Sequence, residues 1–133
     1  MKSVLFVCVH NAGRSQMAEA FLNRIAEEKT LPIRAESAGT LGGGTLNPVA
    51  VQAMEEAGVS MSHHVPKQLT QEMVERAAVV ISMGCGVDAE ACPAKFLVTE
   101  DWGLDDPAGQ PIEKVREIRD QIQEKVRGLL ARS

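Results

Sequence analysis

The sequence predicts an α/β protein with a central parallel sheet and helices on both of its faces. Short apolar runs alternate along the chain with segments in which apolar residues recur every three or four positions. The runs are typical of buried strands, and the periodic segments of amphipathic helices. Because strands that alternate with helices usually pair in parallel, we expect one three-layer domain, residues 1–133, with four central strands.

The first expected strand and the first expected helix lie on either side of a short loop. Residues 4–8 are apolar and partly β-branched, as in a strand buried on both faces. From Ser15 to Ile25, apolar residues recur at helical spacing, and the charged residues 27–29 end the pattern on a solvated face. The loop of residues 9–14 therefore follows the carboxyl end of a strand and precedes a helix.

The next strand and helix are separated by a glycine-rich turn. Residues 33–37 are a weaker strand candidate, and the glycines at 42–44 favour a loop after it. Asn47 and Pro48 are typical of a helix start, with Asn as the cap and Pro at the first helical position. Gly58 is expected to end this helix.

The second half of the chain adds two strands and two helices. Thr70 is expected to cap a short helix that runs to Arg76. Residues 77–83 form a strongly apolar strand candidate, and residues 96–99 form a short fourth one. Apolar residues at helical spacing over residues 112–130 predict a long amphipathic helix.

Composition and charge disfavour several classes of partner. The chain has 14 Lys and Arg against 18 Asp and Glu, a net charge of −4, and no basic run, so nucleic acid is not an expected partner. The apolar run at residues 4–9 is too short to span a bilayer, and no small-residue cleavage site follows it. We expect a cytoplasmic monomer without a membrane partner.

The loop from Cys8 to Ser15 has the residues of an anion site with a nucleophile. Cys8 lies at the carboxyl end of a strand, where α/β proteins bind ligands, and in front of a helix N-terminus that favours anions and thiolates. Arg14 offers a fork of donors that matches a tetrahedral oxyanion. Ser15 can donate to the sulfur, and Asn11 can hold the loop in shape. A buried structural cysteine beside a surface arginine is the alternative. The residues predicted to bind the substrate are Val9, His10, Asn11, Ala12, Gly13, Arg14 and Ser15.

Two more cysteines, Cys85 and Cys92, follow the strand expected at 77–83 and so lie at the same sheet edge as Cys8. An odd number of cysteines in a reducing compartment argues against a disulfide framework. If the pair lay in one helix, the α-carbons would be roughly 10 Å apart, whereas a disulfide requires about 7 Å or less. A bridge would therefore require unwinding, and we interpret the pair as a redox switch.

Two other interpretations of this pair compete with the switch. One is a zinc site that Cys85 and Cys92 form with His63 or His64, although the C-x6-C spacing is not that of the common zinc modules. The other is burial as inert thiols. We interpret His63 and His64 as a solvated turn and His10 as a residue that fills the loop.

Asp105 and Asp106 are candidates for a proton donor. A thiolate that attacks a tetrahedral oxyanion must expel an oxygen, and a nearby carboxyl group can protonate it. Pro107 restricts Asp106 to extended geometry. A simple polar turn is the alternative.

The pattern C-x5-R-S after the first strand resembles the signature loop of the low-molecular-weight tyrosine phosphatases and of the arsenate reductases that share their fold. The stretch CVHNAGRSQMAEAF is most similar to the reductases, through residues 15–19. The resemblance implies a low-molecular-weight phosphatase-like sandwich in which Cys8 attacks a bound oxyanion. It also implies that the Asp of the Asp-Pro pair, Asp106, is the general acid.

The resemblance further implies a thiol relay. Thioredoxin-coupled arsenate reductases carry C-x6-C-P at the place of Cys85 and Cys92. The implied reaction is the reduction of arsenate to arsenite, an arsenic detoxification, in which a disulfide passes from Cys8–Cys85 to Cys85–Cys92. Thioredoxin or another thiol reductant then reduces it, so no flavin, nicotinamide or metal cofactor is expected.

Other features leave alternatives open. The family's tyrosine phosphatases have aromatic residues after the Asp-Pro pair, whereas Ala108 follows here and tyrosine is absent. A phosphatase of the same fold is nevertheless the main rival, and a non-catalytic anion-binding or thiol-sensing regulator is another. Many thioredoxin-coupled members have Ser-Cys in place of Ala12 and Gly13, so the reductant could instead be a low-molecular-weight thiol.

Some relatives bind potassium near the loop. The residues that match their ligands are Asn11, Glu19 and Ser37. A salt bridge made by Glu19 and a turn hydroxyl supplied by Ser37 are the alternative interpretation.

Overall fold

The computed structural model describes residues 2–83 and 100–132 of the chain, so the strand expected at 96–99, and Cys85 and Cys92, lie outside the described residues. Within the described part, the strands are β1 (Lys2–Cys8), β2 (Ile33–Gly39), β3 (Val79–Ser82) and β4 (Glu100–Asp101). The helices there are α1 (Arg14–Glu28), α2 (Pro48–Glu56), α3 (Gln71–Arg76) and α4 (Ile112–Arg132).

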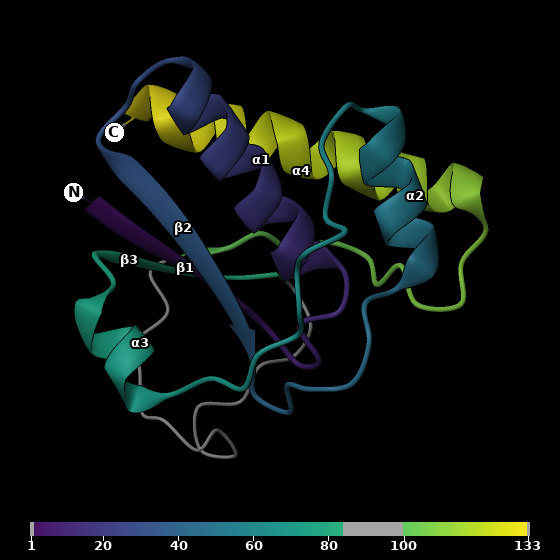
Figure 1. The fold of residues 1–133 in the computed structure, drawn as a ribbon, viewed down its shortest axis with the longest axis horizontal. Coiled ribbons are helices and arrows are strands. Elements are labelled where there is room, and N and C mark those ends of the chain that lie inside the picture. Colours follow the sequence, from purple (N-terminus) through teal and green to yellow (C-terminus); the bar gives the residue numbers. More distant parts are fainter. Residues whose placement is uncertain (1, 84–99, 133) are drawn as a thin grey trace.

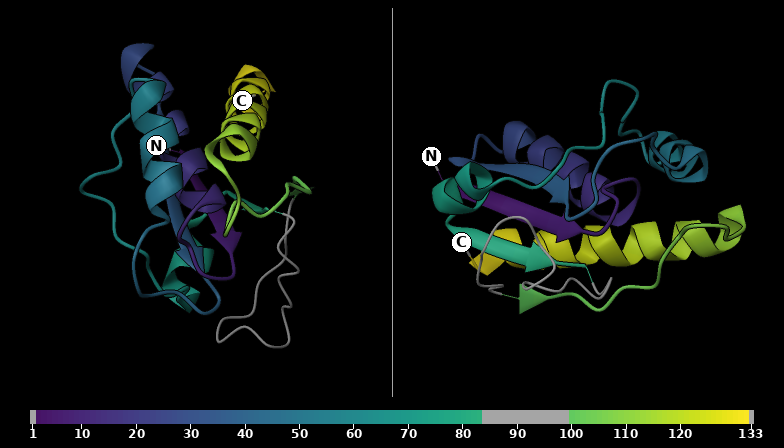
Figure 2. Two further views of the ribbon diagram at one scale, coloured as in Figure 1. Left: turned by 90° about the vertical axis from the view of Figure 1, so that its right-hand side faces the viewer. Right: turned by 90° about the horizontal axis from the view of Figure 1, so that it is seen from below.

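The described strands form one parallel sheet in the order β2-β1-β3-β4. β1 pairs with β2 along its whole length, with Lys2 opposite Ile33 and Cys8 opposite Gly39. β3 pairs with the other edge of β1, and β4 lies beyond β3. The right-hand view of Figure 2 shows the arrowheads at one end of the sheet, so the segments that follow the strands leave from a common edge.

Helices cover both faces of this sheet (Figure 1). α1, α2 and α4 lie on one face and enclose the main core with Val4, Phe6 and Cys8 of β1. α3 lies on the other face, over a smaller apolar cluster that includes Leu5 and Val7. Because successive strand residues point to opposite faces, β1 contributes to both clusters, and Cys8 faces the α1 side. The predicted three-layer sandwich around a parallel sheet is confirmed.

Local sequence signals set most element boundaries. Asn47 caps α2 and Thr70 caps α3 through their side-chain oxygens, as predicted. The strand expected at 77–83 is shorter, Val79–Ser82, because Ala77 is still the C-terminal cap of α3. α4 begins where its apolar periodicity predicts it.

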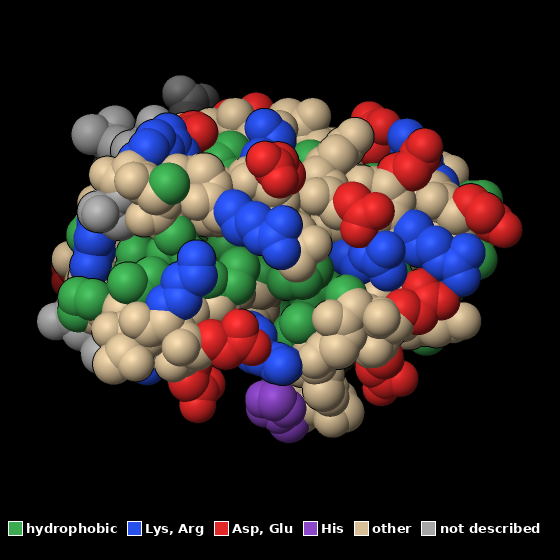
Figure 3. Space-filling model, turned by 90° about the horizontal axis from the view of Figure 1, so that it is seen from above, with side chains coloured by type: hydrophobic (Ala, Val, Ile, Leu, Met, Phe, Trp, Pro, Cys, Tyr) green, Lys and Arg blue, Asp and Glu red, His purple; other side chains and the backbone are tan. Residues whose placement is uncertain are grey.

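Charged side chains of both signs are spread over the helical face of the molecule. Figure 3 shows Lys and Arg side chains interspersed with Asp and Glu on this face. Two ion pairs join α4 to the end of α2. Arg116 Nη2 lies 2.7 Å from Glu56 Oε2, and Arg119 Nη1 lies 3.3 Å from Glu56 Oε1. Such exposed pairs contribute little to stability. Over residues 2–83 and 100–132, no helix has the length and apolar character needed to cross a membrane.

Replacing Gly39 by alanine should destabilise the protein by about 1–3 kcal/mol, the usual range for overpacking. A Cβ at this position would lie 2.4 Å from the carbonyl oxygen of Val9 and 2.9 Å from the backbone nitrogen of Asn11. Both contacts are to the backbone of the loop that follows β1, so neither can move aside like a flexible side chain. Urea unfolding would measure the loss.

Gly128→Ala is the matched control for this substitution. A Cβ on Gly128 meets nothing within 4 Å, and the residue lies inside α4. Alanine there should stabilise the helix by about 0.5–1 kcal/mol. Equal effects at Gly39 and Gly128 would contradict the close packing of Gly39 against the loop.

Candidate active site

Cys8 lies at the end of β1, and it lines a cavity of about 530 Å³. The residue is only 5% exposed, and its access to solvent is through this cavity. Two donor groups approach its sulfur: the N–H of Asn11 lies at 3.1 Å and Ser15 Oγ lies at 2.9 Å. Because α1 begins at Arg14, the positive end of its dipole is at the same loop. These surroundings favour a negatively charged sulfur.

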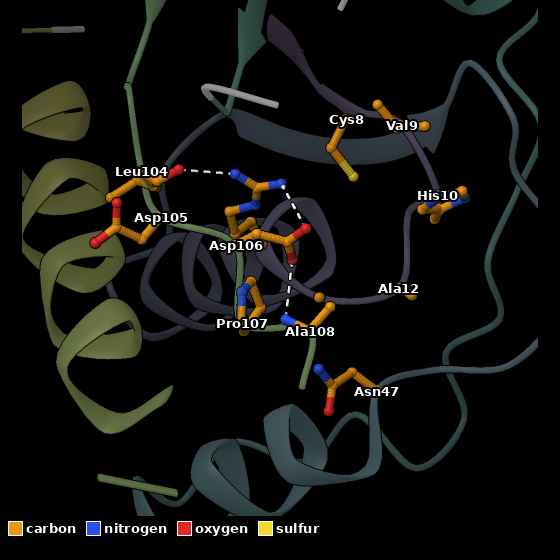
Figure 4. Close-up of a pocket in the computed structure, with 12 residues that line it drawn as sticks. Cys8, Val9, His10, Ala12, Asn47, Leu104, Asp105, Asp106, Pro107 and Ala108 are labelled. Carbon is orange, nitrogen blue, oxygen red and sulfur yellow. Dashed lines mark hydrogen bonds and ion pairs between the residues drawn. The ribbon is translucent and has the colours of Figure 1, made fainter. Parts of the chain in front are cut away.

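Two loops and Asn47, the residue that caps α2, form the walls of the cavity (Figure 4). One follows β1, and the other follows β4 and contains residues 104–108. Asn11 of the first loop and Ser15 of α1 are fully buried and do not line the cavity. The other residues predicted to bind the substrate do line it, namely Val9, His10, Ala12, Gly13 and Arg14.

The guanidinium group of Arg14 is held by backbone from two other segments. Its Nη1 donates to the carbonyl oxygen of Met83 at 3.1 Å and to that of Leu104 at 2.7 Å. The side chain is 7% exposed and lines the cavity. Its Nη2 lies 3.8 Å from Asp106 Oδ2. The structure thus fixes one nitrogen of Arg14 and directs the other toward the carboxylate across the cavity.

The two aspartates of the second loop have different surroundings. Asp105 Oδ2 lies 2.8 Å from Lys114 Nζ, and this hydrogen-bonded ammonium holds the pKa of Asp105 below its usual range. Asp106 instead lies beside Arg14, and its Oδ1 accepts a hydrogen bond from the N–H of Ala108 at 2.9 Å. Asp105 therefore stays ionised and engaged with α4, which leaves Asp106 as the candidate proton donor.

Gly13 and Pro107 bring the two loops into contact. A Cβ on Gly13 would lie 2.9 Å from Pro107 Cγ, closer than such atoms approach in real structures. The lack of a side chain at position 13 therefore lets Pro107, and with it Asp106, pack against the loop that follows Cys8.

A group of buried polar side chains, which no local pattern in the sequence predicts, lies behind the first loop. Gln16 is fully buried, and its Nε2 donates to Asn11 Oδ1 at 2.8 Å. Its Oε1 lies 2.8 Å from His64 Nδ1. The interpretation of His64 as part of a solvated turn is wrong, because its side chain is only 11% exposed. The two residues are 48 positions apart, so no local pattern links them.

The residues that match potassium ligands in some relatives already have other partners. Glu19 Oε1 accepts a hydrogen bond from Ser37 Oγ at 3.0 Å and lies 3.2 Å from Lys67 Nζ. Asn11 Oδ1 accepts from Gln16 Nε2 and from the N–H of Lys67, both at 2.8 Å. With an ammonium group at the carboxylate, these residues do not fit a potassium ion. Across the described ranges, no three metal-ligating side chains come together.

This site belongs to a known family of enzymes. The family model for low molecular weight phosphotyrosine protein phosphatases matches residues 3–133, so the chain belongs to that family. A putative arsenate reductase of Halobacterium salinarum is 40% identical over 129 residues, which cover 91% of this chain and 85% of that protein. A glutaredoxin arsenate reductase of Synechocystis is 38% identical over 133 residues, 99% of this chain and 98% of that one. These relatives confirm the resemblance to arsenate reductases.

Solved structures with the same fold include both classes of enzyme. An arsenate reductase in its phosphate-binding state has a TM-score of 0.80 at 36% identity and covers 99% of this chain and 98% of its own. A thioredoxin-dependent arsenate reductase of Corynebacterium glutamicum has a TM-score of 0.76 at 36% identity, and the match covers 98% of this chain and 61% of that one. A low molecular weight protein tyrosine phosphatase from T. tengcongensis has a TM-score of 0.87 at 25% identity, covering 100% of both chains. The fold alone therefore does not choose between the two activities.

Proposed function

We propose that the protein reduces arsenate to arsenite, with Cys8 as the nucleophile. The observation that carries this proposal is the convergence of a buried sulfur, the Arg14 guanidinium and the Asp106 carboxylate on one cavity. The relatives at 38–40% identity that are named arsenate reductases support the choice of arsenate.

The first step forms a bond between sulfur and arsenic. The loop N–H groups and Arg14 bind the arsenate oxygens, and the Cys8 thiolate attacks arsenic. Asp106 gives a proton to the departing oxygen, which leaves as water. Because Asn11 and Ser15 hydrogen-bond to the sulfur, they favour the thiolate form that this attack requires.

The second step moves two electrons to arsenic. The Cys85 thiolate attacks the Cys8 sulfur, the electron pair of the sulfur–arsenic bond goes to arsenic, and arsenite leaves. Cys92 then attacks Cys85, so that Cys8 leaves as a thiolate and a Cys85–Cys92 disulfide remains. A dithiol protein such as thioredoxin reduces this disulfide. The thioredoxin-dependent structural relative supports this choice of reductant.

Replacing Cys85 by serine tests the proposed relay. We expect the variant to form the Cys8 adduct but to release no arsenite in steady state with thioredoxin, its reductase and NADPH. The native protein, after one turnover without reductant, should contain a disulfide that mass spectrometry assigns to two of its three cysteines. Continued arsenite release by Cys85→Ser would contradict the relay.

The same variant tests the rival function, hydrolysis of phosphate monoesters. The tyrosine phosphatase that shares the fold favours this candidate. Water can hydrolyse a phosphocysteine, so this reaction would need the anion site and Cys8 but no second cysteine. A phosphatase should retain full turnover of p-nitrophenyl phosphate after Cys85→Ser. Arsenite production by the native protein, together with negligible hydrolysis of p-nitrophenyl phosphate, would exclude the phosphatase function.

Replacing Asp106 by asparagine should lower kcat for arsenate by about 10²- to 10⁴-fold, the range for loss of a general acid. The amide keeps the shape of the side chain but cannot protonate the departing oxygen. Asp105→Asn is the matched control, because that carboxylate is exposed and paired with Lys114. Loss of an exposed pair should change the rate by no more than about fivefold. Equal losses in both variants would refute the assignment of Asp106.

A further inference from the structure

Asn47 is the residue at which the segment before α2 meets the substrate cavity. Its backbone N–H donates to the carbonyl oxygen of Ala12 at 2.8 Å, which fastens the residue to the loop that follows Cys8. It also lines the same cavity as Cys8 and Arg14. The sequence explains Asn47 as the cap of α2, and that role uses only the oxygen of its side-chain amide.

The two ends of the Asn47 amide have different surroundings. Oδ1 accepts hydrogen bonds from the backbone N–H groups of Val49 at 2.9 Å and Ala50 at 3.3 Å. Because backbone N–H groups can only donate, the atom that meets them must be the oxygen. Figure 4 shows the nitrogen on the side of Ala108 and the oxygen on the side of α2. Within residues 2–83 and 100–132, Nδ2 has no hydrogen-bond acceptor. The cap thus orients an available donor toward the loop that follows β4.

The loop after β4 forms an acidic wall without a nitrogen donor in its side chains. The residues of this wall are Leu104, Asp105, Asp106, Pro107 and Ala108. Of the described side chains that line the cavity, those with nitrogen donors are His10, Arg14 and Asn47. Arg14 Nη1 is engaged by two carbonyl groups, and its Nη2 lies beside Asp106. His10 is exposed on the loop after β1. Asn47 is therefore the nitrogen donor that faces the acidic wall.

The cavity is large for a tetrahedral oxyanion. Its volume of about 530 Å³ is typical of sites for drug-sized ligands, which are much larger than arsenate or phosphate. An oxyanion bound at Cys8 therefore leaves one side open, and the oxygen on that side points away from the sulfur. Figure 4 shows Asn47 well apart from Cys8, across the group of lining residues. Its donor is thus on the open side of the bound anion.

We propose that Asn47 is a further substrate-binding residue, whose Nδ2 donates to the oxyanion oxygen that points away from Cys8. In the proposed function this is the oxygen that Asp106 protonates, so the part of Asn47 in the reaction rests on that function. A fixed donor there stabilises the negative charge that the departing oxygen develops before it receives the proton. The same contact forms with the bound anion before any reaction, so the binding of phosphate should depend on it too.

Replacing Asn47 by serine separates the donor from the cap. Serine caps helices about as well as asparagine, so the melting temperature should stay within about 2 °C of the native value. The hydroxyl is too short to take the place of Nδ2. In a calorimetric titration, the affinity for phosphate should fall about 3- to 10-fold, as expected for one solvent-accessible hydrogen bond. Asn47→Asp also keeps the cap but turns a carboxylate oxygen toward the anion, so its affinity should fall by more than about tenfold.

Thr70→Ala is the matched control, because it removes a helix cap that does not line the cavity. Thr70 Oγ1 accepts from the N–H of Met73 at 3.2 Å at the start of α3. We expect a lower melting temperature with unchanged affinity for phosphate. Unchanged affinity in Asn47→Ser, or an equal loss in Thr70→Ala, would overturn the proposal. If the native protein binds phosphate but forms no arsenite, the proposed function fails while the titrations still decide the role of Asn47 in binding.

Discussion

Replacing Cys8 by serine is expected to reduce arsenate reduction by roughly 10⁴-fold or more, as loss of a catalytic nucleophile does in other enzymes. The serine hydroxyl keeps the position and the contact with Ser15, but it is not ionised near neutral pH and cannot pass electrons to arsenic. The rate of arsenite formation at saturating reductant is the measurement.

Oxyanion binding is the internal control for this variant. Arg14 and the backbone of the loop remain, so phosphate should still bind to Cys8→Ser with an affinity close to the native value in a calorimetric titration. Arsenite formation by a folded Cys8→Ser protein that still binds phosphate would show that another group carries the chemistry.

Replacing Arg14 by lysine should lower kcat/KM for arsenate by about 10²- to 10³-fold, the range for loss of one preorganised oxyanion donor. Lysine keeps the positive charge but has no planar fork, and it cannot at once bind the anion and the carbonyl groups of Met83 and Leu104. Loss of these two buried hydrogen bonds should also lower the free energy of unfolding by about 1–3 kcal/mol, although the carbonyl of Met83 still accepts a hydrogen bond from the N–H of Leu104.

Arg116→Lys is the matched control for the loss of stability. Arg116 also makes two hydrogen bonds, but to the partly exposed carboxylate of Glu56 on the surface. Steady-state kinetics and urea unfolding of both variants would separate the fork of Arg14 from a general effect of changing Arg to Lys. A loss of activity at Arg116 as large as that at Arg14 would contradict the assignment.

The parts of the site that the sequence could predict are those set by local rules. Cys8, the loop and Arg14 follow from one strand, one turn and the start of one helix, and Asn47 marks the next helix by its capping side chain. The resemblance to the family predicts Asp106 through its Asp-Pro pair. The structure adds a physical reason for that choice, because Lys114 engages Asp105.

The parts that could not be predicted depend on contacts between distant segments. Arg14 reaches carbonyl groups 69 and 90 positions away, and Gln16 reaches His64 across 48 positions. Neither contact leaves a periodic pattern in the sequence. From the sequence, His63 and His64 are both interpreted as a solvated turn. Only the contacts of His64 with Gln16 and Glu19 on α1 show that its ring is largely buried.

The attachment of Arg14 to two remote carbonyl groups has a consequence for how the protein acquires affinity. In a chain in which only β1 and α1 have formed, the loop would lack the two carbonyl groups that orient the guanidinium group of Arg14. Oxyanions should therefore bind only after the segments at Met83 and Leu104 have docked, and they would stabilise the finished fold over every partly assembled form. Phosphate in a refolding buffer would then serve as a reporter for completion of assembly, through a rise in melting temperature that Arg14→Lys diminishes.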